Sequence, residues 1–137
     1  MIEFLLILGF PNCPFCGHAL TGSGLQEYIL DIAATLKPHL TIVDGIVGME
    51  GDGPIMGTPI QSNVIVIGKN LPAVDATCAR IMGIDPKKIS YLKHSSGRIG
   101  AIKESNIEQR GENIQSVRRN YQLLDYIPAQ AEIRLKP

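Results

Sequence analysis

Strand-length apolar runs and amphipathic helical segments alternate along this chain of 137 residues. Three of the runs are short and aliphatic, as buried strands are, and they cover residues 2–8, 40–43 and 63–67. Residues 23–37 place apolar side chains at helical spacing, and Pro38 ends that pattern. This order predicts one α/β domain over residues 1–137, with a small mixed sheet flanked by helices and an irregular C-terminal third.

Capping residues predict two further helices. Asn70 can cap a helix that ends at Gly83, and Asp85 followed by Pro86 is a cap and a first residue for a shorter helix. The rest of the chain has a weaker pattern. Its predicted elements are a strand that runs into a turn at 107–112, a strand or helix at 114–119, and an edge strand at 133–135.

Composition and charge exclude several classes of protein. Thirteen basic and thirteen acidic residues give a net charge of zero, which argues against a dedicated nucleic-acid binder. The apolar runs are too short to cross a bilayer, no signal peptide is legible, and three cysteines do not fit a secreted disulfide framework. We therefore expect a cytoplasmic protein without nucleic-acid or membrane partners.

The charges are nevertheless unevenly distributed along the chain. Residues 1–85 hold three bases against eight acids, and residues 86–137 hold ten bases against five acids. This asymmetry indicates either attraction between the two parts of the fold or a basic surface for a partner or an anionic ligand. His94 lies near Ser95, Ser96 and Arg98, a polar group that could meet an anion.

Residues 44–57 form a stretch rich in glycine and acidic residues between two predicted strands. About 20 residues separate those strands, and connections of this length are often functional. The stretch holds three carboxylates and no base, and it lacks the Gly-Lys-Ser/Thr ending of a phosphate-binding loop. Carboxylates on a pliable backbone suit a hard divalent cation, Mg²⁺, Mn²⁺ or Ca²⁺. The alternative is an ordered array of turns whose acids cap amides or face water.

A fourth acid on the following helix belongs with this stretch. An acid beside an apolar helix face needs a partner, unless it simply complements the helix dipole from the first turn. The predicted metal ligands are Asp44, Glu50, Asp52 and Asp75. The predicted ligand-binding residues are these four together with Gly45, Gly51 and Gly53. No catalytic residue is assigned.

A Cys-x-x-Cys pair, Cys13 and Cys16, precedes His18. The pair looks like a glutaredoxin active site, so thiol redox or electron-transfer chemistry is one interpretation. A zinc site could use the two cysteines and His18 with a fourth ligand from elsewhere. An iron–sulfur cluster usually takes four thiolates, and the chain has three. The remaining interpretation is two cysteines in an irregular loop.

Several motifs resemble an uncharacterised family, domain of unknown function 362. They lie at 37–45, 48–59, 71–86 and 97–100, and the Met-Glu-Gly-Asp-Gly-Pro run that starts at Met49 is the most specific of them. The resemblance covers about residues 25–120, and residues 1–22, with the N-terminal strand and the cysteine loop, diverge. It implies a site at Asp44, Glu50, Asp52 and Asp75. Family members are often joined to ferredoxin-type iron–sulfur modules, which implies an iron–sulfur protein as a partner.

The resembled part corresponds to the C-terminal half of longer family members, and the Lys-Thr-His-type motif of their first half is missing. Three hypotheses follow. The first is a ligand- or metal-binding domain with its site at residues 44–57 and Asp75, and with the family's iron–sulfur or redox association. The second is a thiol redox or metal site at Cys13 and Cys16. The third is a non-catalytic subunit that forms homo-oligomers through apolar surface left bare by the missing half.

Overall fold

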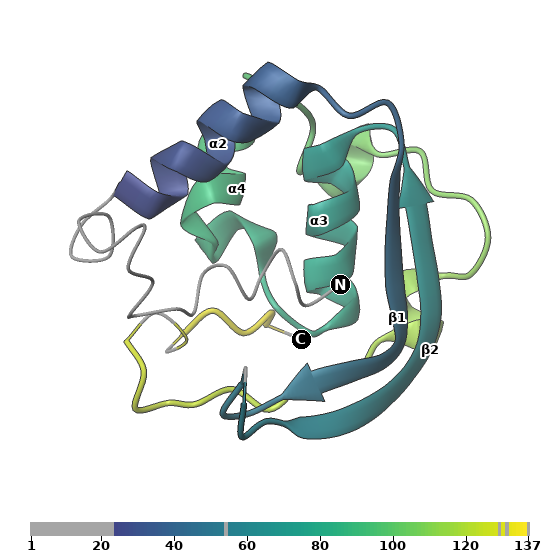
Figure 1. Ribbon diagram of the computed structural model, residues 1–137. Helices are drawn as coiled ribbons and strands as arrows, with labels where there is room; N and C mark the ends of the chain where they lie inside the picture. The colour runs from purple at the N-terminus through teal and green to yellow at the C-terminus, as the bar shows by residue number, and fades with distance from the viewer. Residues whose placement is uncertain (1–23, 54, 129, 131, 137) are drawn as a thin grey trace.

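The structure, a computed structural model, describes residues 24–53, 55–128, 130 and 132–136 (Figure 1). The predicted strand at 2–8 and the residues Cys13, Cys16 and His18 lie outside these ranges. No helix within the described ranges is long and apolar enough to cross a membrane.

Two antiparallel strands and several helices make up the described part, so the predicted mixed α/β fold is confirmed. The elements in chain order are α2 (Gly24–Leu36), β1 (Thr41–Glu50), β2 (Thr58–Gly68), α3 (Leu71–Ile81), the 3-10 helix η2 (Pro86–Lys88), α4 (Ser90–Ser95), the 3-10 helix η3 (Glu104–Asn106) and α5 (Ile114–Val117). In Figure 1, α3 lies against the β1–β2 hairpin, and α2 and α4 lie on the far side of α3.

The hairpin corrects the prediction of a loop over residues 44–57. β1 continues to Glu50 and pairs with β2 throughout, with Asp44 opposite Ile65 and Glu50 opposite Thr58. Only residues 51–57 connect the strands, so Asp44 lies within a strand and not beyond its end. Cross-strand hydrogen bonding overrides the low strand propensity of glycine here. Of the glycines in the predicted loop, only Gly51 has a left-handed φ, of 74°.

A bulge bends the hairpin near its middle. The register shifts between Gly45 and Val47, and the facing residue Asn63 on β2 has a φ of 54°. An extra residue on one strand increases the local bend, and Figure 1 shows the hairpin curving around the helices. Next to the bulge, Ser62 points inward and its hydroxyl lies 2.7 Å from the hydroxyl of Tyr121.

Local capping signals correctly predicted where α3 and η2 begin, although η2 is a 3-10 helix of three residues and α4 starts separately after Ile89. The side chain of Asn70 accepts a hydrogen bond from the backbone N–H of Ala73 at the start of α3. Gly83, just beyond the end of α3, has a left-handed φ of 77°. Asp85 caps η2 by accepting from the N–H of Lys87, and Pro86 is the first residue of that helix. α3 and α4 then bury Ala76, Ala79 and Leu92 in the core.

The C-terminal third differs from the prediction. Residues 107–112 form no strand, residues 114–117 form the short helix α5, and Arg134 makes only an isolated bridge with Ile84 instead of an edge strand. The backbone of this region instead hydrogen-bonds the end of α3. The N–H groups of Arg119, Tyr121 and Leu135 donate to the carbonyls of Ile81, Met82 and Gly83. The chain's own tail thus satisfies carbonyls at a helix end.

Candidate ligand-binding cleft

The acids of the predicted site lie apart along the hairpin. Asp44 is exposed, and its Oδ1 accepts a hydrogen bond of 2.9 Å from the N–H of Ile46. Glu50 is half-buried, and its Oε2 accepts from the N–H of Gln122 at 2.8 Å. Six strand positions separate the two acids, which corresponds to about 20 Å. One cation therefore cannot bind both carboxylates in this conformation.

The remaining predicted residues do not complete a cluster. Asp52 is exposed in the connection between the strands, where the N–H of Gly53 donates to the carbonyl of Gly51. Gly45 is buried within β1. Among the described residues, no three His, Cys, Asp or Glu side chains are grouped as a metal ion requires. The divalent-cation site thus gains no geometric support and stays a prediction.

Asp75 lies instead on the helical side of the fold. It is the fifth residue of α3, beyond the first turn, so the prediction that it complements the helix dipole is wrong. Its partner is Tyr91, whose hydroxyl donates to Oδ2 at 3.4 Å. Burial raises the pKa of Asp75 from 3.8 to about 6, and the hydrogen bond from Tyr91 opposes that rise only in part.

Two neighbours make the surroundings of Asp75 poorly solvated. Cys78, one turn further along α3, is 4% exposed, and burial together with the charge of Asp75 raises its pKa to about 12. Burial and the same carboxylate also raise the pKa of Tyr91. Cys78 therefore stays a thiol at neutral pH. A carboxyl whose pKa is shifted toward neutrality by burial is a typical feature of functional sites.

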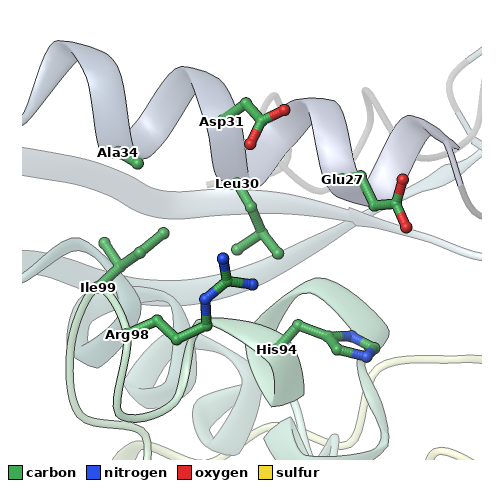
Figure 2. A pocket seen from close by; sticks show the side chains of 7 residues that line it. All are labelled: Glu27, Leu30, Asp31, Ala34, His94, Arg98 and Ile99. Atoms are coloured by element: carbon green, nitrogen blue, oxygen red, sulfur yellow. The ribbon is translucent and has the colours of Figure 1, made fainter.

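A cleft opens next to this half-buried acid, between α2 and α4. Its outer part has a volume of about 370 Å³, and Figure 2 shows the side chains that line it. An inner hollow of about 20 Å³ reaches Asp75 and Tyr91. Leu30 and Ile99 line both parts, so the outer cleft and the inner hollow adjoin each other.

The two walls of the cleft carry opposite charges. Glu27 and Asp31 lie one turn apart on α2, while His94 and Arg98 lie on and just after α4 (Figure 2). Within the described ranges, no ion pair joins the two walls, and the side chains of Glu27, Asp31 and Arg98 make no hydrogen bond. Each of these groups therefore keeps its capacity to bind a ligand of opposite charge.

The orientation of His94 is set by its own helix. Nδ1 lies 2.8 Å from the carbonyl oxygen of Ser90, and because a carbonyl only accepts, Nδ1 carries the proton. Nε2 is then the nitrogen available to a ligand. The sequence had indicated that His94 and Arg98 could meet an anion. The acidic wall on α2 was not predicted. Its signal in the sequence is the four-residue spacing of Glu27 and Asp31, which places both side chains on one face of a helix.

Comparison with known proteins places part of this chain in a family. Residues 13–80 match the family described as domain of unknown function (DUF362). The thylakoid-associated protein sll1697 of Synechocystis sp. is 32% identical over 66 residues, which are 48% of this chain and 21% of the relative. The matched part thus spans about a fifth of that relative's length. No solved structure matches the chain.

The matched range covers the hairpin and most of α3, including the four predicted acids, whereas His94 and Arg98 lie beyond it. The basic wall of the cleft is therefore a feature of this chain outside the matched segment. The motifs around Asp44, Glu50, Asp52 and Asp75 lie within that segment, as the sequence resemblance predicted. Over residues 13–80, this chain belongs to the domain of unknown function 362 family.

Proposed function

We propose that this chain is a ligand-binding domain whose site is the cleft between α2 and α4. The ligand is a small zwitterion, such as an α-amino acid, an ω-amino acid or a peptide end. The observation that carries this proposal is the pair of oppositely charged walls that do not neutralise each other across the cleft.

Each wall fits one end of such a ligand. The guanidinium of Arg98 can hold a carboxylate through two parallel hydrogen bonds, and Nε2 of His94 adds a donor when the ring is protonated. The carboxylates of Glu27 and Asp31 suit an ammonium group. Leu30 and Ile99 supply apolar surface between the charged groups. The volume of about 370 Å³ lies in the usual range for small-molecule sites, roughly 300–1,000 Å³.

Asp75 is expected to make ligand binding in the cleft depend on pH. The inner hollow of about 20 Å³ lies between the outer cleft and the carboxyl of Asp75, so a ligand in the outer cleft does not contact that carboxyl directly. A cationic group placed there favours the ionised form of Asp75 and lowers its pKa. Binding near pH 6 is then expected to release protons.

Isothermal titration calorimetry tests this function directly. α- and ω-amino acids are titrated into the full chain, with acetate and ethylammonium as probes that carry only one of the two charges. Zwitterions are expected to bind more tightly than either single-charge probe. Arg98→Ala and the double variant Glu27→Gln with Asp31→Asn are expected to weaken binding about tenfold or more. Absence of any zwitterion binding at millimolar concentration contradicts the proposal.

Arg110→Ala is the matched control for the loss of an arginine. Arg110 is exposed and its guanidinium pairs with Glu108 at 2.7 Å, and neither residue lines the cleft. Zwitterion affinity is expected to be unchanged in this variant. Equal losses of zwitterion affinity in Arg98→Ala and Arg110→Ala would indicate a general effect of the protein's net charge and not a specific binding site.

The other functions predicted from the sequence are separate proposals. A divalent cation at Asp44, Glu50, Asp52 and Asp75, and a thiol or metal site at Cys13, Cys16 and His18, are distinguished by elemental analysis of protein purified without oxygen or chelator. Zinc or iron that is lost in Cys13→Ser would support the cysteine site. An iron–sulfur partner and a cytoplasmic location likewise stay predictions.

A further inference from the structure

The side of the β1–β2 hairpin that faces away from α3, the outer face, is aliphatic and exposed. Its members are each 46–63% exposed, and they are Leu40, Ile42, Ile46, Val47, Ile65 and Ile67. Ile42 and Ile67 stand directly opposite each other in the register. An antiparallel sheet with one face in water normally carries polar residues on that face. Aliphatic residues on both faces are typical of a sheet that is covered on both sides.

The outer face also carries one acid and one base at matched positions. Asp44 stands two positions from Ile42 toward the bulge. Lys69 follows Gly68, whose inner side meets Val74, so strand alternation turns Lys69 outward, two positions from Ile67 in the other direction. The two charges therefore lie on either side of the apolar centre formed by Ile42 and Ile67.

We propose that a second copy of this chain covers the outer face in a two-fold symmetric dimer. A two-fold axis that lies in the interface and crosses the strands at Ile42 and Ile67 reverses the strand direction between the copies. It brings Asp44 beside Lys69 of the partner subunit, and the same pair forms a second time. In an isologous interface the same surface of each copy must complement itself. This face does so because its acid and its base lie at equal distances on opposite sides of its centre, so each meets the opposite charge of the other copy.

The size of the face sets the expected affinity. Four of the aliphatic side chains lie within two strand positions of the axis and offer on the order of 100 Å² each, namely Leu40, Ile42, Ile65 and Ile67. With Ile46 and Val47 included, two copies bury at most about 1,200 Å² in total. That area is at the lower end of specific protein interfaces. Burial of aliphatic side chains provides the driving force, while two exposed ion pairs choose the orientation and add little affinity. We therefore expect a dimer that dissociates in the micromolar range.

Sedimentation equilibrium of the full chain tests the dimer. The wild-type chain is expected to dimerise at micromolar concentration. Ile67→Lys is expected to raise the dissociation constant at least tenfold without unfolding the monomer, because Ile67 is already 61% exposed. A chain that stays monomeric, with its outer face covered by its own residues 1–23 or reserved for another protein, overturns the proposal.

Charge reversal tests the orientation. Asp44→Lys and Lys69→Asp are each expected to weaken the dimer, and the double variant is expected to restore it, because the reversed charges pair across the interface again. Asp125→Lys, a reversal at an exposed residue outside the hairpin, is the control and is expected to change nothing. Dissociation constants are compared for variants whose circular dichroism matches that of the wild type. A double variant weaker than both single variants overturns this two-fold arrangement.

Discussion

Both faces of the β1–β2 hairpin carry small or aliphatic residues, yet their surroundings differ. On the inner face, Ser62 is 1% exposed and meets Tyr121, which the C-terminal segment delivers to the sheet. On the outer face, Ile42 and Ile67 stay more than 60% exposed. The C-terminal segment therefore covers the inner side of the sheet, while the aliphatic outer side stays exposed. Substitutions on the two sides are expected to have different costs.

The largest loss of stability is expected when Gly48 on the inner face is replaced. A Cβ at this position would overlap the hydroxyl end of the Tyr121 ring. Gly48→Ala should therefore lower the free energy of unfolding by about 3 kcal/mol, measured by urea denaturation. Gly53→Ala is the control, since its Cβ would meet only the flexible side chain of Met49 at 3.2 Å. Similar losses in both variants would show that Tyr121 does not close the inner face.

A pH-dependent gain in stability is expected when Asp75, on the helical side of the fold, is replaced. The folded state raises its pKa from 3.8 to about 6, so folding favours the protonated carboxyl. The stabilising effect of protonation is complete below pH 4 and is lost as the pH rises through about 6. Asp75→Asn should therefore stabilise the protein by about 3 kcal/mol at pH 8 and hardly at all at pH 4. Thermal melts at both pH values measure this, and an equal gain at both would refute it.

A smaller loss is expected when the hydroxyl of Tyr121 is removed. Tyr121→Phe leaves the buried hydroxyl of Ser62 without its partner and should cost about 1–2 kcal/mol of unfolding free energy. Ser62→Ala in the same chain removes the unpaired group, so the double variant should lose less than the sum of the single variants. Strict additivity in this cycle would argue against the hydrogen bond at 2.7 Å.

The smallest effect is expected on the outer face. Ile65 is 58% exposed, so Ile65→Thr should change the unfolding free energy of dilute monomer by no more than about 0.5 kcal/mol. The same variant should weaken dimerisation at micromolar concentration, because it replaces part of the proposed contact with a polar group. A large loss of monomer stability would mean that the chain itself already covers this face.

Part of the candidate site was readable in the sequence. His94 and Arg98 are close in the chain, so their joint position could be anticipated, and Asp75 was marked by its place beside an apolar helix face. The cleft itself could not be anticipated. It depends on how α2 packs against α4, which brings Glu27 and Asp31 opposite Arg98 across about seventy residues of sequence. Nothing in local spacing reports that contact.

The elements with local signals could be predicted from the amino-acid sequence alone. Asn70 and Asp85 cap their helices through side chains that reach only two or three residues along the chain, and the mixed α/β class follows from the order of apolar runs. The length of β1, in contrast, depends on long-range pairing with β2. The glycines after Asp44 favour a loop when considered alone, but pairing with β2 satisfies their backbone groups, and the Tyr121 hydroxyl fits against Gly48 because that residue has no side chain.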